Sequence, residues 1–251
     1  MLYAENTPNN LGVTLSGDQR DFDELYDSLH RLIGEEGEYE GFDAARIRIL
    51  GFCYDLRHAL MGDREYSFVD SGLDDHKKRT LGVLGPEKNL NLSFNTLWPE
   101  MHFVMLALND FIILYMRHQK KTSFKDSLFR DPRLCWDKTV ANVRMLQSAV
   151  SECLREILTE KAYAGLMNAM NGRYASSLFF TTQYIDLLNI RFIKMKKDKR
   201  LKSISAYGKR IAKQDDEYWD LTGEFRQAAK EHGTHILDLR LNMEYPEEME
   251  W

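Results

Sequence analysis

The chain has 251 residues, of which 43% are hydrophobic, 29% are charged and 12% are aromatic, a composition that excludes a largely disordered protein. Its formal net charge of -5 argues against a general nucleic-acid binder, whose affinity for phosphate comes from clustered Lys and Arg. The first residues carry neither a basic start nor an apolar run, so secretion is not expected and a cytoplasmic protein is predicted.

The first predicted elements are a strand, two helices and a second strand. Apolar and small residues alternate over residues 11–16, the pattern of a strand that buries one face. Asp21 is the expected cap of a helix that Gly34 ends, and Asp43 opens the next helix. Residues 66–68 alternate again, with two aromatic side chains expected to face the core.

The middle of the chain is predicted to be a strand followed by helices. Residues 89–95 alternate between apolar and polar side chains. The apolar run over residues 101–116 is shorter than a bilayer requires and contains His102, so it is predicted to be a buried core helix. Asp137 and Thr159 are expected to precede two further helices.

The last part of the chain is predicted to be helical up to a final strand. Residues 176–193 have helical spacing, and two amphipathic helices after them end near Gly233. The basic stretch at residues 191–202 is interpreted as the solvated C-terminal end of a helix, where cations are favoured. From residue 235 to residue 245 every second side chain can face a core, which strongly indicates a strand.

Together these elements predict an α+β fold. Strands that alternate cleanly are typical of an antiparallel sheet that is covered on one face, and a mainly helical layer would cover it. The predicted sheet is small, with about four strands that include the N-terminal and C-terminal ones. Pairing of these two strands would close residues 1–251 into a single domain.

The cysteines and the common enzyme motifs indicate no metal or cofactor. Cys53, Cys135 and Cys153 are far apart and lie within helical apolar patterns, so they are predicted to be reduced core thiols. The glycine-rich nucleotide motifs, the serine-hydrolase motif and the zinc motifs are missing from the sequence. Neither a cofactor nor a metal site is therefore expected.

One predicted helix carries the candidate catalytic residues. Arg48, Gly51, Asp55, His58 and Gly62 recur at helical spacing and form a single narrow stripe. Asp55 could orient and charge-stabilise His58, which is the arrangement that a general base needs. The same side chains also suit a structural ion-pair network, because buried charges need partners, so both interpretations stay open.

A second set of residues is predicted to bind a partner. Asparagine is a poor strand former, so the asparagines that share one side of residues 89–95 indicate a contact surface, although solvent alone would also explain them. The acidic tail ends on an aromatic residue that could anchor in a partner or fold back onto the domain. With charged residues near the catalytic stripe, the predicted binding residues are Arg57, Asp63, Arg64, Asn89, Asn91, Asn95 and Trp251.

Three groups of short motifs carry a resemblance to a known family. They are NTPN at residues 6–9 with GV and GD soon after it, LGFCYDLRH at residues 50–58 with GDRE at residues 62–65, and EYPEEMEW at residues 244–251. On these motifs the chain resembles an uncharacterised bacterial family, a domain of unknown function, over nearly its whole length. The resemblance implies a bacterial, cytosolic, single-domain protein, and it supplies no catalytic residue.

Two functional hypotheses follow from the sequence. The first is a non-catalytic accessory protein that binds a protein partner or a second copy of itself, in a bacterial system such as phage defence. Neither a membrane nor a nucleic acid is expected as its partner, and the missing catalytic motifs favour it. The alternative is a hydrolase or ribonuclease that uses His58 and Asp55 with nearby arginines, Arg48 among them.

Overall fold

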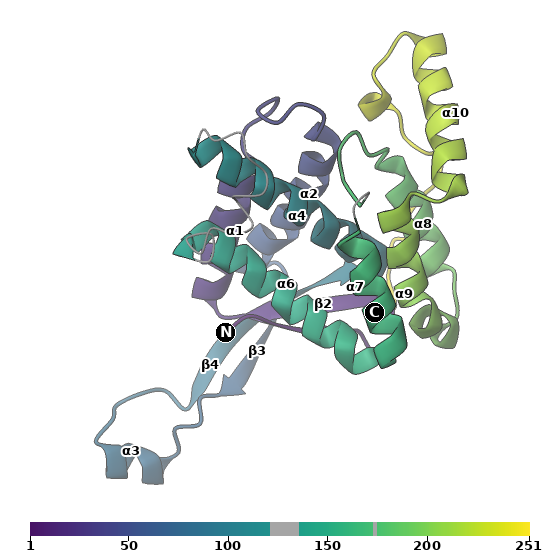
Figure 1. Ribbon diagram of the computed structural model, residues 1–251. Helices are drawn as coiled ribbons and strands as arrows, with labels where there is room; N and C mark the ends of the chain where they lie inside the picture. Colours follow the sequence, from purple (N-terminus) through teal and green to yellow (C-terminus); the bar gives the residue numbers. More distant parts are fainter. Residues whose placement is uncertain (121–135, 173–174) are drawn as a thin grey trace.

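A four-stranded antiparallel sheet forms one layer of the fold (Figure 1). The computed structural model describes residues 1–120, 136–172 and 175–251. The strands in these residues are β1 (Tyr3–Asn6), β2 (Gly12–Gly17), β3 (Glu65–Asp70) and β4 (Lys88–Leu97). Their order across the sheet is β1-β2-β4-β3, and every neighbouring pair is antiparallel. The predicted α+β class and the small antiparallel sheet are confirmed.

Helices make up most of the remaining described chain. The first group contacts the sheet and consists of α1 (Gln19–Ile33), α2 (Asp43–Leu60), α4 (Trp98–Lys120) and α6 (Lys138–Ile157). The second group extends the core beyond α4 and consists of α7 (Glu160–Met170), α8 (Gln183–Ile193), α9 (Lys197–Lys213) and α10 (Asp216–His232). The short α3 (Asp75–Leu81) stands apart, between β3 and β4.

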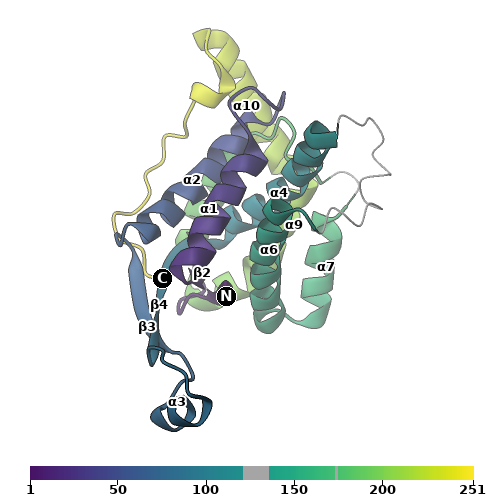
Figure 2. The same cartoon turned by 90° about the vertical axis from the view of Figure 1, so that its left-hand side faces the viewer.

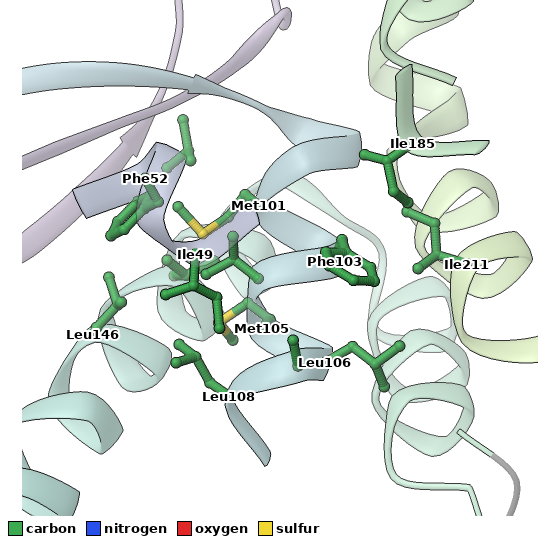
Figure 3. Packing of buried hydrophobic residues seen from close by; sticks show 14 of the residues in the cluster. Ile49, Phe52, Met101, Phe103, Met105, Leu106, Leu108, Leu146, Ile185 and Ile211 are labelled. Atoms are coloured by element: carbon green, nitrogen blue, oxygen red, sulfur yellow. The ribbon is translucent and has the colours of Figure 1, made fainter. Parts of the chain in front are cut away.

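Helix α4 is the centre of the hydrophobic core (Figure 3). Met101 lies beside Ile49 and Phe52 of α2, whereas Phe103 points toward Ile185 of α8. A helix that is apolar on nearly all sides needs neighbours all round, and α4 has them in α2, α6, α8 and α9. The long apolar run is thus the predicted core helix, and none of the helices in the described ranges has the length and apolarity to span a membrane.

The apolar face of the sheet is covered by α1 and α2. Phe94 of β4 makes edge-to-face contacts with Phe22 of α1 and Phe52 of α2, with ring centroids 5.8 Å and 5.2 Å apart. All three side chains are buried. Such aromatic pairs add to the stabilisation that burial alone provides, so this cluster fixes both helices on β4.

Helix ends follow local signals in the sequence, with one shift. Asp18, and not Asp21, is the cap of α1: its carboxylate accepts a hydrogen bond from Asp21 N, and the Asp21 carboxylate accepts one from Asp18 N. Gly34 ends this helix, and Asp137 and Thr159 cap α6 and α7, as predicted. Caps are hydrogen bonds between near neighbours in the chain, which is why a sequence reveals them.

The predicted strand at residues 235–245 is wrong. The chain makes a single 3₁₀ turn there, η2 (Ile236–Asp238), and then runs back along the body toward the sheet without entering it (Figure 2). Gln183 of α8 donates hydrogen bonds to the carbonyls of Ile236 (2.7 Å) and Leu239 (3.0 Å). A side chain thus satisfies backbone groups that a strand neighbour would have paired. The place beside β2 is taken by β1, which alternation did not reveal.

The basic stretch at residues 191–202 lies only in part at a helix C-terminus, with Arg191 in the last turn of α8 and Lys194 directly after it. It crosses from the end of α8 into the first turns of α9. Its Arg200 donates a hydrogen bond to the carbonyl of Ile193 at 2.7 Å, and so satisfies one of the free carbonyls at the end of α8. The helix predicted for residues 176–193 is also shorter, because α8 begins at Gln183.

The turn between β1 and β2 brings Gly12 against β4. The Thr7 hydroxyl accepts hydrogen bonds from the backbone N–H groups of Leu11 and Gly12, both at 3.0 Å, which closes the turn. Gly12 pairs with Leu97 in the ladder between β2 and β4, and a Cβ atom at position 12 would lie 2.1 Å from the carbonyl oxygen of Thr96. A side chain at this position would force the two strands apart.

Replacing Gly12 with alanine is therefore expected to destabilise the fold by about 2–3 kcal/mol, because the backbone of Thr96 cannot rotate away from the new methyl group. Urea denaturation of the Gly12→Ala protein measures this loss. Gly223→Ala in α10 is the matched control, since a Cβ there meets no atom within 4 Å and alanine favours helix. Equal loss in both variants would contradict the proposed strand clash.

Candidate functional site

An open pocket of about 840 Å³ gathers most of the residues that the sequence analysis singled out. It lies between α2, the start of β3, the end of β4, the start of α4 and the C-terminal tail. Six of the ten predicted catalytic and binding residues line it: Arg48, Asp55, Asp63, Arg64, Asn95 and Trp251. Its apolar walls include Phe52, Phe94 and Met249. Segments far apart in the sequence therefore meet at one place.

Arg48 is one of two arginines in the lining of the pocket. Its two terminal nitrogens donate hydrogen bonds to Asp186 Oδ1, both at 2.8 Å, and its Nε lies 3.4 Å from Glu100 Oε1. The side chain is only 19% exposed. Burial alone would lower the pKa of Arg48, but the charges of Glu100 and Asp186 outweigh it and hold the pKa above its ordinary value. The guanidinium thus contacts two carboxylates, although its Nε has no hydrogen-bond partner among the described residues.

The two other catalytic candidates are not paired with each other. Asp55 accepts a hydrogen bond from Arg64 at 2.7 Å, across the turn that joins α2 to β3. His58 Nδ1 lies 3.2 Å from Asp63 Oδ2, and its ring packs on Tyr54 with centroids 4.2 Å apart. The acidic partner of His58 is therefore Asp63 rather than Asp55. These two contacts hold the turn to the helix.

Three pocket residues were missed by the sequence analysis. Asn189 of α8 donates hydrogen bonds to Glu100 Oε2 (2.9 Å) and to the Tyr245 hydroxyl (3.2 Å), and Tyr245 donates to Asp186 Oδ1 (3.1 Å). Burial first, and the Asp186 charge second, raise the pKa of Tyr245. Tyr245 belongs to the closing EYPEEMEW motif, which was the available signal. Asn189 and Glu100 lie in helices, and nothing in their local sequence distinguishes them as pocket residues.

The charge of the pocket is negative. Its lining carries four carboxylates (Asp55, Asp63, Glu65 and Glu100) and two guanidinium groups (Arg48 and Arg64). A negative lining repels phosphate, so it disfavours the phosphodiester substrate of a ribonuclease. The lining is thus a polar junction in which Arg48 pairs with Glu100 and Arg64 pairs with Asp55, with two carboxylates in excess.

The motif segments of the sequence meet around this junction. NTPN supplies Asn6, whose side-chain oxygen accepts a hydrogen bond from Trp98 Nε1 at 2.9 Å, and Gly12 of the same turn lies against the ring of Trp251. LGFCYDLRH and GDRE supply Asp55 and Arg64, which pair with each other. The tail that ends the chain thus folds back onto the domain.

The asparagines of the predicted contact surface have different roles in the structure. Asn95 accepts a hydrogen bond from the Thr14 hydroxyl at 2.6 Å, and Asn91 donates one to the Tyr3 hydroxyl at 3.2 Å. Asn89 is exposed and lies opposite Val69 in the ladder between β3 and β4. The inner asparagines therefore help hold the sheet together, and only the outer end of β4 presents a free polar face.

The other predicted binding residue, Arg57, lies on the exposed face of α2. Its guanidinium lies over the Tyr54 ring, 5.5 Å from the centroid. Such a cation–π contact on the surface is worth about 0.5–1 kcal/mol. Arg57 is thus outside the pocket.

The outer part of the hairpin, residues 65–91, forms an arm that projects from the body (Figures 1 and 2). It consists of β3, α3 and the first half of β4. Tyr66, Phe68 and Leu90 lie on the face that continues the covered face of the sheet, yet they are 61%, 65% and 43% exposed. The expectation that the two aromatic residues of β3 face the core is therefore wrong, because no helix reaches over the arm within the described ranges.

Comparison with known proteins places this fold in a family. A family described as a domain of unknown function, DUF6904, matches residues 2–251. The chain belongs to the DUF6904 family. The match covers the sheet, the arm, the helical core and the tail, so all of these are parts of the DUF6904 domain. No curated protein and no solved structure matches the chain.

The described residues of the DUF6904 domain contain no group of three His, Cys, Asp or Glu side chains that could hold a metal ion. Cys53 and Cys153 are buried and reduced, as predicted, whereas Cys135 lies outside the described residues. Burial raises the pKa of both described thiols to about 12, which keeps them protonated and unreactive. The exposed apolar residues of the arm, by contrast, have no packing role in the core of the described part of the domain.

Proposed function

We propose that the chain is a non-catalytic, self-associating protein and that the arm is its contact surface. The observation that carries this proposal is the apolar face of the arm, where Tyr66, Phe68 and Leu90 are exposed to solvent. Exposed aromatic side chains gathered on one face are a feature of protein contact sites. The rings of Tyr66 and Phe68 pack edge to face, 6.2 Å apart, so they form a single preformed surface.

The backbone of β3 supports the same proposal. β3 is the last strand of the sheet, so one of its edges has no strand neighbour. Proteins commonly protect such edges with charges, proline or bulges, because a free edge pairs with another strand. β3 instead has the sequence EYSFVD, with acidic residues only at its two ends. A second copy of the chain offers the same free edge, and a two-fold arrangement satisfies both at once.

The charged candidates support a non-catalytic protein. Arg48, Asp55 and His58 are each bound to a neighbouring charged side chain, and the first two hold α2 to α8 and to the turn before β3. A structural role accounts for these contacts without a reaction. We also propose that the protein acts in the bacterial cytoplasm, as part of an accessory system such as phage defence.

Tyr66→Ser/Phe68→Ser is expected to convert an associating wild-type protein into a monomer, because it removes the apolar surface of the arm. The melting temperature of the folded monomer should change little, since both side chains are exposed. Size exclusion with light scattering, run over a range of protein concentrations, measures the mass.

Trp219→Ser is the matched control for this experiment, since Trp219 is an exposed aromatic residue on α10 and far from the arm. It should leave the mass of the assembly unchanged. A wild-type protein that stays monomeric at every concentration, or an assembly that survives loss of both aromatic residues, would contradict the proposal.

A further inference from the structure

We infer that two copies of the chain pair edge to edge through β3, antiparallel to each other. The two-fold axis lies midway between Ser67 of one copy and Ser67 of the other. This inference rests on the proposed self-association and specifies its geometry. It follows from three features of the arm: which backbone groups face the free edge, which residues carry charge, and which residues are apolar.

The ladder between β3 and β4 fixes which backbone groups are free. Glu65 is opposite Ser93 and Asp70 is opposite Lys88, and Ser71 N continues the ladder by donating to the carbonyl of Glu87 at 2.7 Å. In an antiparallel ladder, alternate residues direct their N–H and C=O groups to the neighbour, and the residues between them direct theirs away. Ser71 and every second residue before it therefore face β4.

The free edge of β3 consequently carries the backbone groups of Tyr66, Phe68 and Asp70. A second strand can bond to these groups only if its own outward-facing residues stand opposite them. For two identical strands this requires that one residue of β3, here called the centre, stands opposite the same residue of the second copy. The possible centres are thus few, and over β3 together with Arg64, which directly precedes it, the centres with the largest overlap are Tyr66, Ser67 and Phe68.

The side chains distinguish these three centres. With Ser67 at the centre, Tyr66 lies opposite Phe68 of the second copy, and Arg64 lies opposite Asp70 of the second copy. With Phe68 at the centre, Tyr66 would lie opposite Asp70 of the second copy. With Tyr66 at the centre, Phe68 would lie opposite Arg64 of the second copy. Aromatic pairs and opposite charges across strands are stabilising, so Ser67 is the favoured centre.

The charge match occurs twice, once on each side of the axis. Arg64 stands directly before β3, and its guanidinium already binds Asp55 of its own chain. It has five N–H donors, so it can bind a second carboxylate. Asp70 is exposed at the other end of β3, and within the described ranges its carboxylate accepts a hydrogen bond only from nearby Gly72 N, at 2.8 Å. Each arm thus carries complementary charges at the spacing that this register needs.

The resulting assembly joins the two sheets into one. Tyr66, Phe68 and Leu90 of both copies then lie on the same face, and they form one apolar band across the axis. Ser67 and its counterpart face each other on the opposite, polar face, as a pair without mutual hydrogen bonds. The Cα atoms of such a pair lie about 4.5 Å apart, which is within the range that a disulfide spans.

Ser67→Cys tests the register, because the new cysteines would oppose each other across the axis. Under mild oxidation this variant is expected to run mostly as a covalent dimer on a non-reducing gel. Val69→Cys is the matched control: it lies on the same face of β3, but its counterpart across the axis is Glu65. It should give no more dimer than wild-type protein, which also controls for the native cysteines.

Glu65→Cys/Val69→Cys is a second probe, in case the geometry at the axis is poor, because it places two cysteine pairs across the same register. Cross-linking by Ser67→Cys or by this double variant, and not by Val69→Cys alone, is the expected result. If neither cross-links while association still depends on Tyr66 and Phe68, the register is overturned and self-association through the arm stands. A wild-type protein that is always monomeric overturns both.

Discussion

Arg48→Ala is expected to lower the free energy of unfolding by about 3 kcal/mol. The substitution leaves the Asp186 and Glu100 carboxylates in a largely buried place, without the cation that both contact. Tyr245 and Asn189 would still donate hydrogen bonds to these carboxylates, which softens the loss without replacing the charge. The tail, which Tyr245 ties to this network, should loosen as well.

Urea denaturation at a fixed protein concentration measures this effect, because an associating protein has a concentration-dependent stability. Arg20→Ala is the matched control, since its ion pair with Glu24 lies on the exposed face of α1 and should matter little. A loss in Arg48→Ala no larger than that of the control would show that the pocket network is not structural. The charged stripe would then be free for another role.

Acid is expected to destabilise the protein through His102. This side chain is fully buried in α4 and stacks on Trp98, with ring centroids 5.5 Å apart. Its Nε2 donates a hydrogen bond to the carbonyl of Ile204 at 3.0 Å, and its Nδ1 has no hydrogen-bond partner in the part of the chain that the structure describes. Burial lowers the pKa of His102 to about 4, and the Ile204 carbonyl only partly opposes this.

The sign of the pH dependence follows from these values. Below the ordinary pKa of 6.5 the unfolded chain binds a proton at His102, whereas the folded chain does not until the pH approaches 4. The folded state is therefore fully stable with respect to this group above pH 6.5 and loses roughly 3 kcal/mol as the pH falls from 6.5 to 4. Denaturation curves across this interval measure the slope.

His102→Gln separates this contribution from that of the carboxylates, which titrate in part of the same interval. Glutamine can keep the hydrogen bond to the Ile204 carbonyl but cannot be protonated. The variant is expected to show a shallower loss of stability between pH 6.5 and 4 than the wild-type protein, whatever its stability at neutral pH. Parallel curves for the two proteins would show that His102 does not titrate in this way.

The candidate site could be predicted from the sequence only in part. Helical spacing correctly placed Arg48 and Asp55 on one side of α2, where both line the pocket. The partners of Arg48 could not be predicted, because Asp186 and Glu100 come from helices that only tertiary packing brings to α2. Helical spacing predicted Asp55 as the acidic partner of His58, whereas the partner in the structure is Asp63, in the turn after the helix.

The sequence by itself determined the elements that depend on near neighbours in the chain. The α+β class, the caps at Gly34, Asp137 and Thr159, and the core helix α4 all follow from hydrogen bonds and periodicity within a few turns. Only the tertiary structure decided which alternating segments become strands and which apolar faces are covered. Residues 235–245 and β3 both alternate, but strand pairing and helical cover come from distant parts of the chain, so the first is no strand and the second is an uncovered one.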